Sequence, residues 1–422
     1  MKHFEEREIK KDNFEKFKIF TPRIVEQTLS LIKKTKGKKI INFNSTLEGG
    51  GVAGLITNEL AFENYLGYQN RGYVLKGPKK FFVITKKIHN LLQGKEGVLK
   101  KEEKNFYLDF LLKKTSTDFL KILEKENPEI VVIHDPQLLP LIKFIPSRIK
   151  SVLRLHIDLS SPNKKVLSFL KPFILSYHKI IFSHPDYVFE WLPKEKAEII
   201  FPAINPFEEK NKSLKISLAK EILFSFGINP EKPILFQVAR FDFWKDQLAT
   251  LKTYYLAKNS YPELQLVLAG FFQAKDDPEA IDYLKKVKKH SQGDPDIFLF
   301  SELSQIKGTS NDLFINALNT AGTVFIHKSI REGFGLAITE AMWKKKPVIA
   351  GRTKGIELQI EDKKTGFLVD NALEASFWLK KLLGDKRLRK KIGQAGHQRI
   401  KEKFLFSRLI FDKVNLYLNL FH

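Results

Sequence analysis

Short runs of consecutive apolar residues alternate along the chain with longer stretches that mix apolar and polar positions. In the first half, apolar runs lie at 39–43, 130–134 and 152–157, and the stretch 52–66 has the length and composition of a helix. Continuous apolar runs of this length are typical of parallel strands that are buried on both faces. The pattern therefore predicts a parallel sheet with helices on its two sides.

The second half repeats the pattern after an irregular, proline-rich stretch at 201–207 that we interpret as a linker. Strands are expected at 233–239, 264–270, 297–300, 324–326 and 347–349, with helices such as 246–258 and 278–290 between them. We predict an α/β protein of two doubly wound, Rossmann-like domains, 1–205 and 206–404, that face each other across a cleft. The end of the chain, 385–422, is predicted to be helical and basic throughout, with a helix at about 405–422 that packs back on the first domain.

Composition narrows the classes of protein. Of the 422 residues, 43% are apolar, which is enough for sizeable cores, and none is cysteine. A thiol nucleophile, a disulfide and a cysteine-ligated metal are therefore excluded. The charged N-terminal sequence does not resemble a signal peptide, and no apolar run approaches the roughly 20 residues that span a bilayer. We expect a soluble, cytoplasmic protein without stable membrane insertion.

The formal net charge of +24 raises the question of nucleic acid or an anionic membrane as a partner. Lysine far outnumbers arginine, however, and is spread along the chain, whereas arginine is preferred for forked contacts to phosphates and bases. We interpret most of this charge as a solvated surface that attracts anionic substrates, and we expect no specific nucleic-acid partner.

The segment with the most chemistry follows the predicted strand 323–327. Here Gly333-Phe334-Gly335 opens a helix, with Glu332 in the turn and Glu340 one to two turns into the helix. A helix that begins at a glycine turn presents backbone N–H groups and a positive dipole end to an anion. One carboxylate can then reach a sugar hydroxyl and the other a ribose, which predicts a nucleotide-sugar site. The alternative is an ordinary helix start with solvated acids.

A basic loop follows the predicted strand 233–239. Arg240 lies at the carboxyl end of this strand and Lys245 lies just before the next helix. Two cations across a short loop suit a diphosphate, because arginine binds as a planar fork and lysine as a point charge. The alternative is an exposed basic loop without a ligand.

Polar residues also gather at the strand ends of the first half. They are Gly49, Gly50 and Gly51 after the first strand, His134, Asp135 and Gln137 after the second, and His156 and Asp158 after the third. Carboxyl ends of parallel strands meet at one edge of a sheet, so these residues indicate a binding rim. A tight strand–helix turn and structural histidines remain alternatives. No metal-ligand spacing is present, and Asp294-Pro295-Asp296 lies in a loop away from this rim, so we predict no metal site.

Taken together, the pairs Arg240/Lys245 and Glu332/Glu340 resemble the donor site of the retaining glycosyltransferases of family 4, which have the GT-B fold. The resemblance narrows to the trehalose synthase subgroup. It extends over most of the chain, through the stretches 44–53, 81–94, 134–137, 156–163, 238–245, 276–279 and 329–369.

The resemblance implies a role for each matching residue. Arg240 and Lys245 would hold the donor diphosphate, and Glu340 would bind the ribose. Glu332 would grip the hydroxyls of the transferred sugar together with backbone N–H groups. His156 would lie near the reacting carbon, and Asp135 would face the acceptor. The remaining donor residues would be Phe334, Gly335, Leu336, Gly50 and Gly51, and the acceptor residues Gly49, His134 and Gln137.

The implied activity is transfer of glucose, with retention, from ADP-glucose or UDP-glucose to glucose, which forms trehalose reversibly without a metal or other cofactor. A homodimer is left open. Alternatives are a trehalose phosphorylase, a family 4 transferase with a polysaccharide or lipid acceptor, and a nucleic-acid-binding protein on an inactive transferase fold. Gly54 stands where the subgroup leads us to expect Glu, and Lys354-Gly355 where a Gly-Gly pair is usual, so the sequence leaves the acceptor open.

Overall fold

A computed structural model describes residues 2–45, 50–271 and 278–421 of the chain. The chain divides into two compact units. Unit 1 comprises Met1–Ala203 together with Phe406–His422, and unit 2 comprises Ile204–Leu405. We describe each unit separately. Gly49, which the sequence assigns to the acceptor site, and the stretch 276–277 lie outside the described residues.

The centre of unit 1 is a sheet with seven strands among its described residues, in the order β1-β3-β2-β4-β5-β6-β7. All neighbouring strands are parallel except β1 and β3, which are antiparallel. The expected strands at 39–43, 130–134 and 152–157 are confirmed as β2, β4 and β5. The strands are β1 (Phe4–Arg7), β2 (Lys39–Asn44), β3 (Gln69–Leu75), β4 (Ile130–His134), β5 (Lys150–Leu155), β6 (Lys179–Phe182) and β7 (Ala197–Ile199).

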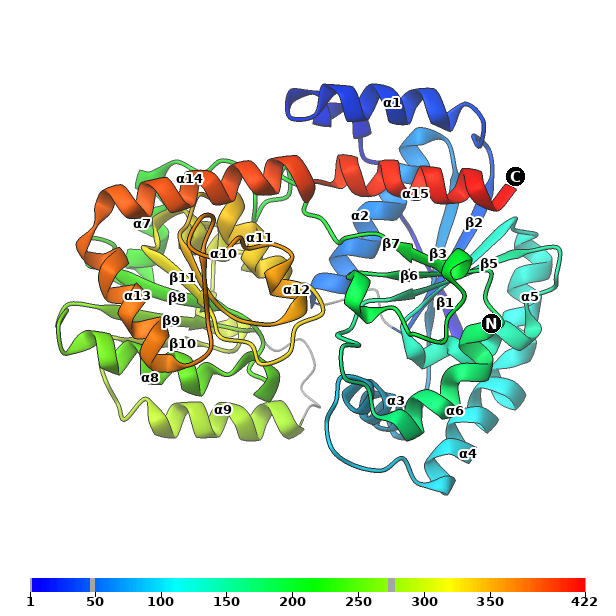
Figure 1. The fold of residues 1–422 in the computed structure, drawn as a ribbon, viewed down its shortest axis with the longest axis horizontal. Helices are drawn as coiled ribbons and strands as arrows, with labels where there is room; N and C mark the ends of the chain where they lie inside the picture. The colour runs from blue at the N-terminus through cyan, green and yellow to red at the C-terminus, as the bar shows by residue number, and fades with distance from the viewer. Residues whose placement is uncertain (1, 46–49, 272–277, 422) are drawn as a thin grey trace. The chain divides into compact units, whose positions relative to one another are not determined.

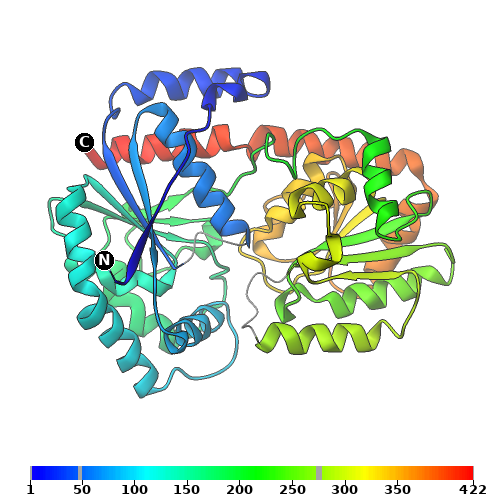
Figure 2. The same ribbon diagram turned by 180° about the vertical axis from the view of Figure 1, so that it is seen from behind.

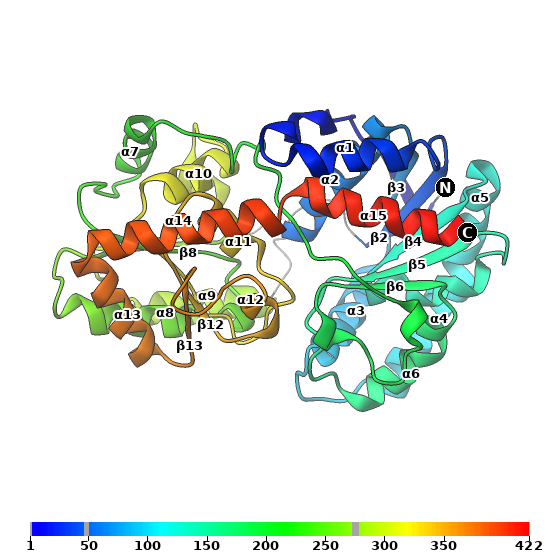
Figure 3. The ribbon, with the colours of Figure 1, turned by 45° about the horizontal axis from the view of Figure 1, so that its top comes forward.

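Helices cover both faces of this sheet. One face carries α1, α2 and α15, and the other carries α3 to α6 (Figures 1 and 2). Helix α15 comes from the end of the chain and lies beside α1, where the Thr21 hydroxyl donates to that of Ser407 at 2.8 Å (Figure 3). The helices are α1 (Pro22–Ile32), α2 (Gly50–Leu66), α3 (Lys79–Leu92), α4 (Lys101–Asp109), α5 (Ser116–Glu126), α6 (Lys164–Leu175) and α15 (Phe406–Phe421).

The two faces of the sheet differ in chemistry. Alternate residues of a strand point to opposite faces, so Phe43, Ile133 and Leu155 join the apolar core under α3 to α6. The residues between them point to the face that α2 and α15 cover, and several are polar and buried, among them Asn42 and Arg154. This face therefore needs internal hydrogen bonds or ion pairs, since a buried polar group without a partner is costly.

Unit 2 repeats the architecture with a sheet that is parallel throughout. Its described strands follow the order β10-β9-β8-β11-β12-β13. Helices α8, α9 and α13 pack on one face and α7, α10 and α11 on the other (Figure 1). The strands are β8 (Ile234–Val238), β9 (Gln265–Ala269), β10 (Ile297–Phe300), β11 (Val324–His327), β12 (Val348–Gly351) and β13 (Phe367–Val369). The helices are α7 (Ile216–Ser225), α8 (Gln247–Lys258), α9 (Pro278–His290), α10 (Asn311–Ala321), α11 (Leu336–Trp343), α12 (Lys354–Glu357), α13 (Ala372–Gly384) and α14 (Lys386–Lys403).

The prediction for the end of the chain was wrong in one respect. The stretch 385–422 forms two helices, α14 and α15, and only α14 is basic. Most of α15 is apolar and buried, and its cations are Arg408 and Lys413. The prediction rested on the lysine count of the whole stretch. That count averages α14, which is solvated, with α15, which belongs to a core.

Candidate active site

The turn between β11 and α11 depends on two glycines, Gly335 within the turn and Gly355 of α12 packed against it. Gly335 has φ +92°, in the left-handed region that glycine favours, and caps the start of α11. A Cβ on Gly355 would stand 2.5 Å from the carbonyl oxygen of Glu332 and 2.6 Å from that of Gly333. The Gln359 side chain donates to the carbonyl oxygen of Phe334 and so stabilises the turn. The strand, glycine turn and helix predicted from the sequence are confirmed here.

Glu332 lies at the centre of a polar cluster in this turn. Its Oε2 accepts from Lys245 Nζ at 2.5 Å, His327 Nε2 at 2.9 Å and the Ser329 hydroxyl at 3.3 Å. Burial alone would raise the pKa of Glu332, but the Lys245 ammonium and the His327 N–H outweigh burial and hold this pKa well below its usual range. The group is therefore a fixed carboxylate.

His327 is part of this cluster, although the sequence did not single it out. Burial is the main cause that lowers its pKa, so the ring is neutral, and its Nε2 carries the proton that Glu332 accepts. Its Nδ1 is buried and has no hydrogen-bond partner among the described residues. The signal that could have found it is its position at the carboxyl end of β11, the same signal that indicated His134 in the first half.

The basic loop after β8 holds its two cations differently. Lys245 ends a short 3-10 helix and reaches Glu332, as described above. Arg240 is 67% exposed and lies 3.6 Å from the Asp242 carboxylate, which also caps the turn by accepting from the Trp244 N–H at 2.8 Å. Lys245 is thus held in place, whereas the guanidinium of Arg240 extends into solvent at the end of a parallel strand.

Glu340 lies on the first turns of α11 and is buried. Its Oε1 accepts from Lys210 Nζ at 2.8 Å, and Lys210 also lies 3.7 Å from Glu208. Burial opposes the charge on Lys210, but Glu340 and Glu208 outweigh burial and raise the lysine pKa above its ordinary value. This pair could not be predicted from the sequence, because Lys210 belongs to an irregular segment far from Glu340 along the chain.

In unit 1 the predicted histidines meet at the carboxyl ends of β4 and β5. His134 Nδ1 lies 3.1 Å from His156 Nε2, and the two rings stack with an angle of 14° between their planes. Burial, followed by the nearby positive charge of Arg154, keeps the pKa of both rings well below its ordinary value. Both rings are therefore neutral at physiological pH.

Asp135 supports the same edge from within the protein. It is buried, has φ +59°, and its Oδ1 accepts from the backbone N–H of His156 at 2.8 Å. Burial raises its pKa to about 7, against the opposing effects of the His156 N–H and of Arg154. The carboxyl thus titrates near neutral pH.

This shift predicts a pH-dependent effect of Asp135→Asn on stability. The folded pKa of about 7 exceeds the unfolded value, so the folded state binds more protons and wild-type stability falls as pH rises from about 4 to about 7. Asparagine keeps an oxygen for the His156 N–H and removes the titration. The variant should therefore melt higher, relative to wild type, at pH 8 than at pH 4, as scanning calorimetry at the two values would measure. An equal difference at both would contradict the assignment.

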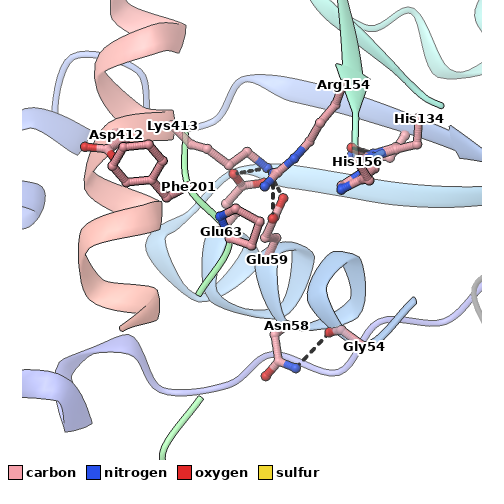
Figure 4. Close-up of polar contacts among 12 residues, drawn as sticks. Gly54, Asn58, Glu59, Glu63, His134, Arg154, His156, Phe201, Asp412 and Lys413 are labelled. Carbon is pink, nitrogen blue, oxygen red and sulfur yellow. Dashed lines mark hydrogen bonds and ion pairs between the residues drawn. The ribbon is translucent and has the colours of Figure 1, made fainter. Parts of the chain in front are cut away.

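A buried ion cluster lies between α2, β5 and α15. Glu59 accepts from Arg154 Nη1 at 2.6 Å and from Lys413 Nζ at 2.8 Å, and Lys413 also lies 2.8 Å from Glu63 (Figure 4). Burial raises the pKa of Glu63, and Lys413 opposes that shift. Burial opposes the charge on Lys413, but Glu59 and Glu63 raise its pKa. Two carboxylates and two cations thus balance, and none of the four was predicted as important.

The remaining predicted residues of unit 1 follow the carboxyl ends of its strands. Gly50 and Gly51 begin α2, and Gln137 follows β4 in a 3-10 helix with its Oε1 buried and unpartnered among the described residues. Asp158 Oδ1 accepts from the N–H and hydroxyl of Ser160, a local turn. A Cβ on Gly54 would meet no atom of the described residues within 4 Å, so this part of the structure leaves open space where the subgroup leads us to expect a larger side chain.

Asp294 and Asp296 have structural partners in unit 2. Asp294 accepts from the Tyr254 hydroxyl at 3.0 Å, and Asp296 accepts from Lys258 Nζ at 2.7 Å. Within the described ranges, no three His, Asp or Glu side chains group as metal ligands, and no helix is long and apolar enough to cross a membrane.

Comparisons with known proteins agree with this geometry. Residues 42–189 match the family model described as the N-terminal domain of trehalose synthase, and residues 219–399 match that of glycosyl transferases group 1. The chain is 40% identical to a trehalose synthase of Thermococcus litoralis over 91% of this chain and 92% of that protein. A trehalose synthase of Rubrobacter xylanophilus is 35% identical over 92% of each chain.

More distant relatives share less. A trehalose phosphorylase of Pleurotus pulmonarius is 29% identical over 79% of this chain but only 50% of its own length. Among solved structures, sucrose-phosphate synthase of Thermosynechococcus elongatus superposes with a TM-score of 0.68 at 17% identity, over 91% of this chain and 99% of that one. Trehalose-6-phosphate synthase of E. coli gives 0.70 at 12% identity, over 91% and 99%. These structures establish the GT-B fold, and the sequence relatives show that the chain belongs to the trehalose synthase family of glycosyltransferases.

Proposed function

We propose that this protein transfers glucose from a nucleotide-glucose to glucose, with retention at the anomeric carbon, and so forms trehalose reversibly. The observation that carries the proposal is 40% identity to a trehalose synthase over 91% of the chain. The chain has the four donor-site residues that the resemblance implies, Arg240, Lys245, Glu332 and Glu340. A nucleotide-sugar donor is also consistent with an enzyme that acts in the cytoplasm.

In unit 2, the cations and the carboxylates are proposed to bind different parts of the donor. Arg240 is exposed and able to fold over a diphosphate, whereas Lys245 is held against Glu332. Glu332 is a fixed carboxylate and thus accepts hydrogen bonds from sugar hydroxyls. Glu340 binds the ribose in this proposal after its ion pair with Lys210 opens or is shared.

The reaction we propose needs no carboxylate nucleophile. The acceptor hydroxyl oxygen bonds to the anomeric carbon on the face that the diphosphate leaves. The bond from that carbon to the diphosphate oxygen breaks, and this departing oxygen takes the hydroxyl proton. Negative charge grows on the diphosphate during this step, and preorganised cations such as Arg240 and Lys245 stabilise it.

These two cations also lead us to propose that no metal ion takes part. A divalent metal in other phosphate chemistry neutralises charge on the leaving group, a role that Arg240 and Lys245 cover here. Turnover in the presence of EDTA should then stay within about twofold of turnover without it, because that role does not depend on a metal. A loss of activity that added Mg²⁺ or Mn²⁺ restores would contradict metal independence.

The test of the function is direct. The protein is incubated with ADP-glucose or UDP-glucose and free glucose, and NMR follows nucleotide release and the disaccharide. An α,α-linked disaccharide supports the proposal, and the two donors give the base preference. Donor binding without a disaccharide would keep the donor site but reject glucose as the acceptor, and the open space at Gly54 would then be the first place to look.

The trehalose phosphorylases provide the rival function, since 79% of this chain matches one of them. A phosphorylase would break trehalose with inorganic phosphate and use no nucleotide. Trehalose and phosphate are therefore added in a parallel reaction without nucleotide, and release of glucose 1-phosphate there would favour the rival.

A further inference from the structure

A continuous path of hydrogen bonds joins α15 to His156 through the polar face of the unit 1 sheet. It begins at Glu63, whose Oε1 accepts from Lys413 Nζ at 2.8 Å and from the Tyr417 hydroxyl at 3.1 Å. Its Oε2 accepts from Asn70 Nδ2 at 2.9 Å. The path then continues through Asn42 to the two stacked histidines.

The direction of donation along this path is fixed at its start. The Lys413 ammonium lies 2.8 Å from Glu63 and opposes the effect of burial on its pKa, so we take Glu63 as a carboxylate. A carboxylate accepts hydrogen bonds but cannot donate them, so the amide nitrogen of Asn70 must face Glu63. The amide oxygen of Asn70 therefore points the other way, where it accepts from Asn42 Nδ2 at 3.4 Å. That contact in turn leaves the oxygen of Asn42 as the group that faces His134.

The same direction of hydrogen-bond donation continues through the two histidines. Asn42 Oδ1 lies 3.1 Å from His134 Nε2, which must therefore carry a proton and donate. A neutral imidazole has one N–H, so His134 Nδ1 is an acceptor, and its neighbour at 3.1 Å, His156 Nε2, must donate to it. His156 is neutral too, and its single proton is then on Nε2.

We propose that Glu63, Asn70 and Asn42 are positioning residues that hold His156 in the Nε2–H tautomer, so that its Nδ1 is an acceptor for a substrate hydroxyl. The proposal rests on the proposed function in one respect, that His156 contacts the sugars. It deepens that function by naming the group recognised. A neutral acceptor nitrogen binds an O–H donor and offers nothing to a phosphate oxygen or a carbonyl oxygen.

The buried ion cluster acts on this path at Glu63 and again at the two histidines. Lys413 holds Glu63 as an acceptor, and α15 thereby contributes to the site without touching a substrate. Arg154 lies two residues before His156 on the same face, and its Nη2 is buried without a hydrogen-bond partner among the described residues. Burial, followed by the positive charge of Arg154, disfavours a second proton on either histidine (Figure 4).

The first experiment measures the tautomer in the wild-type protein without substrate. The full chain is labelled with ¹⁵N-histidine, and the His156 signals are identified by their loss in His156→Asn. The protonated and lone-pair nitrogens of a neutral imidazole resonate far apart, so the spectrum states which nitrogen carries the proton. We expect a proton on Nε2 alone, and a proton on Nδ1 would overturn the proposal whatever the activity.

The second experiment removes the fixed direction of hydrogen-bond donation at Glu63. Glu63→Gln keeps the shape of the side chain but can turn an amide N–H toward Asn70, which permits the reverse direction. Both tautomers of His156 should then appear, and kcat/KM should fall by about tenfold or more, since a wrong tautomer is costly in other histidine-dependent sites. Tyr417→Phe is the matched control, because it removes one hydrogen bond to Glu63 but leaves the carboxylate, so a single tautomer should persist.

Other outcomes separate the tautomer from the function. If Glu63→Gln does not fold, Asn42→Leu removes the acceptor of His134 within unit 1 and serves instead, with the same mixture of tautomers expected. A single Nε2–H tautomer in either released variant would overturn the role of the path. Wild-type protein with the expected tautomer but no disaccharide formation would count against the proposed function and leave the tautomer assignment standing.

Discussion

Replacing Lys245 with alanine should lower turnover by about 10²–10³-fold, the range found when a single preorganised electrostatic group is removed. Two effects combine. The variant loses a cation proposed to stabilise the departing diphosphate. It also leaves Glu332 with His327 and Ser329 as the donors to the same oxygen, so this buried carboxylate is less well fixed.

Steady-state kinetics with the nucleotide-glucose and glucose would measure the effect. Lys252→Ala is the matched control, because Lys252 is an exposed lysine on the next helix, α8, and its loss should leave turnover near the wild-type value. Arg240→Ala should also lower turnover, with a larger share of the effect in donor binding because its side chain is exposed. Near-normal turnover in Lys245→Ala would refute the proposed role of the loop.

The fold could be predicted because its signal is local. Most strands of the two sheets are short apolar runs, although β1 and β3 are not, and the turn at Gly333-Phe334-Gly335 combines a strand, glycines and a helix within a few residues. The sequence therefore placed Glu332 in the turn and Glu340 on α11. The same local reasoning called α14 and α15 equally basic, since lysine content says nothing about which face of a helix is buried.

The partners of these residues could not be predicted, because they are contacts between distant segments. Lys210 pairs with Glu340, and nothing in either neighbourhood indicates the other. The path from Glu63 to His156 likewise joins α15, α2 and three strands. His327 is the exception, since its position at a strand end is visible in the sequence. Buried polar contacts satisfy groups that packing has already enclosed, so they are decided after the fold and not by local pattern.

Replacing Lys413 with methionine should lower the stability of unit 1 by about 3–5 kcal/mol, because it leaves a buried carboxylate without its cation. Arg154 stays on Glu59, so the uncompensated group is Glu63, whose remaining donors among the described residues are the neutral groups of Asn70 and Tyr417. Chemical denaturation followed by circular dichroism would measure the loss.

The reason for this loss can be tested separately from its size. Asn419→Met puts the same side chain at an exposed position of α15 and should change little. Lys413→Met combined with Glu63→Gln removes the charge with its cation, so it should recover most of the stability that Lys413→Met loses. A double variant as unstable as Lys413→Met would show that the lysine acts through packing of its alkyl chain and not through charge. Recovery would show that α15 is held in unit 1 by paired charges, in which case the C-terminal helix is the anchor of the path that ends at His156.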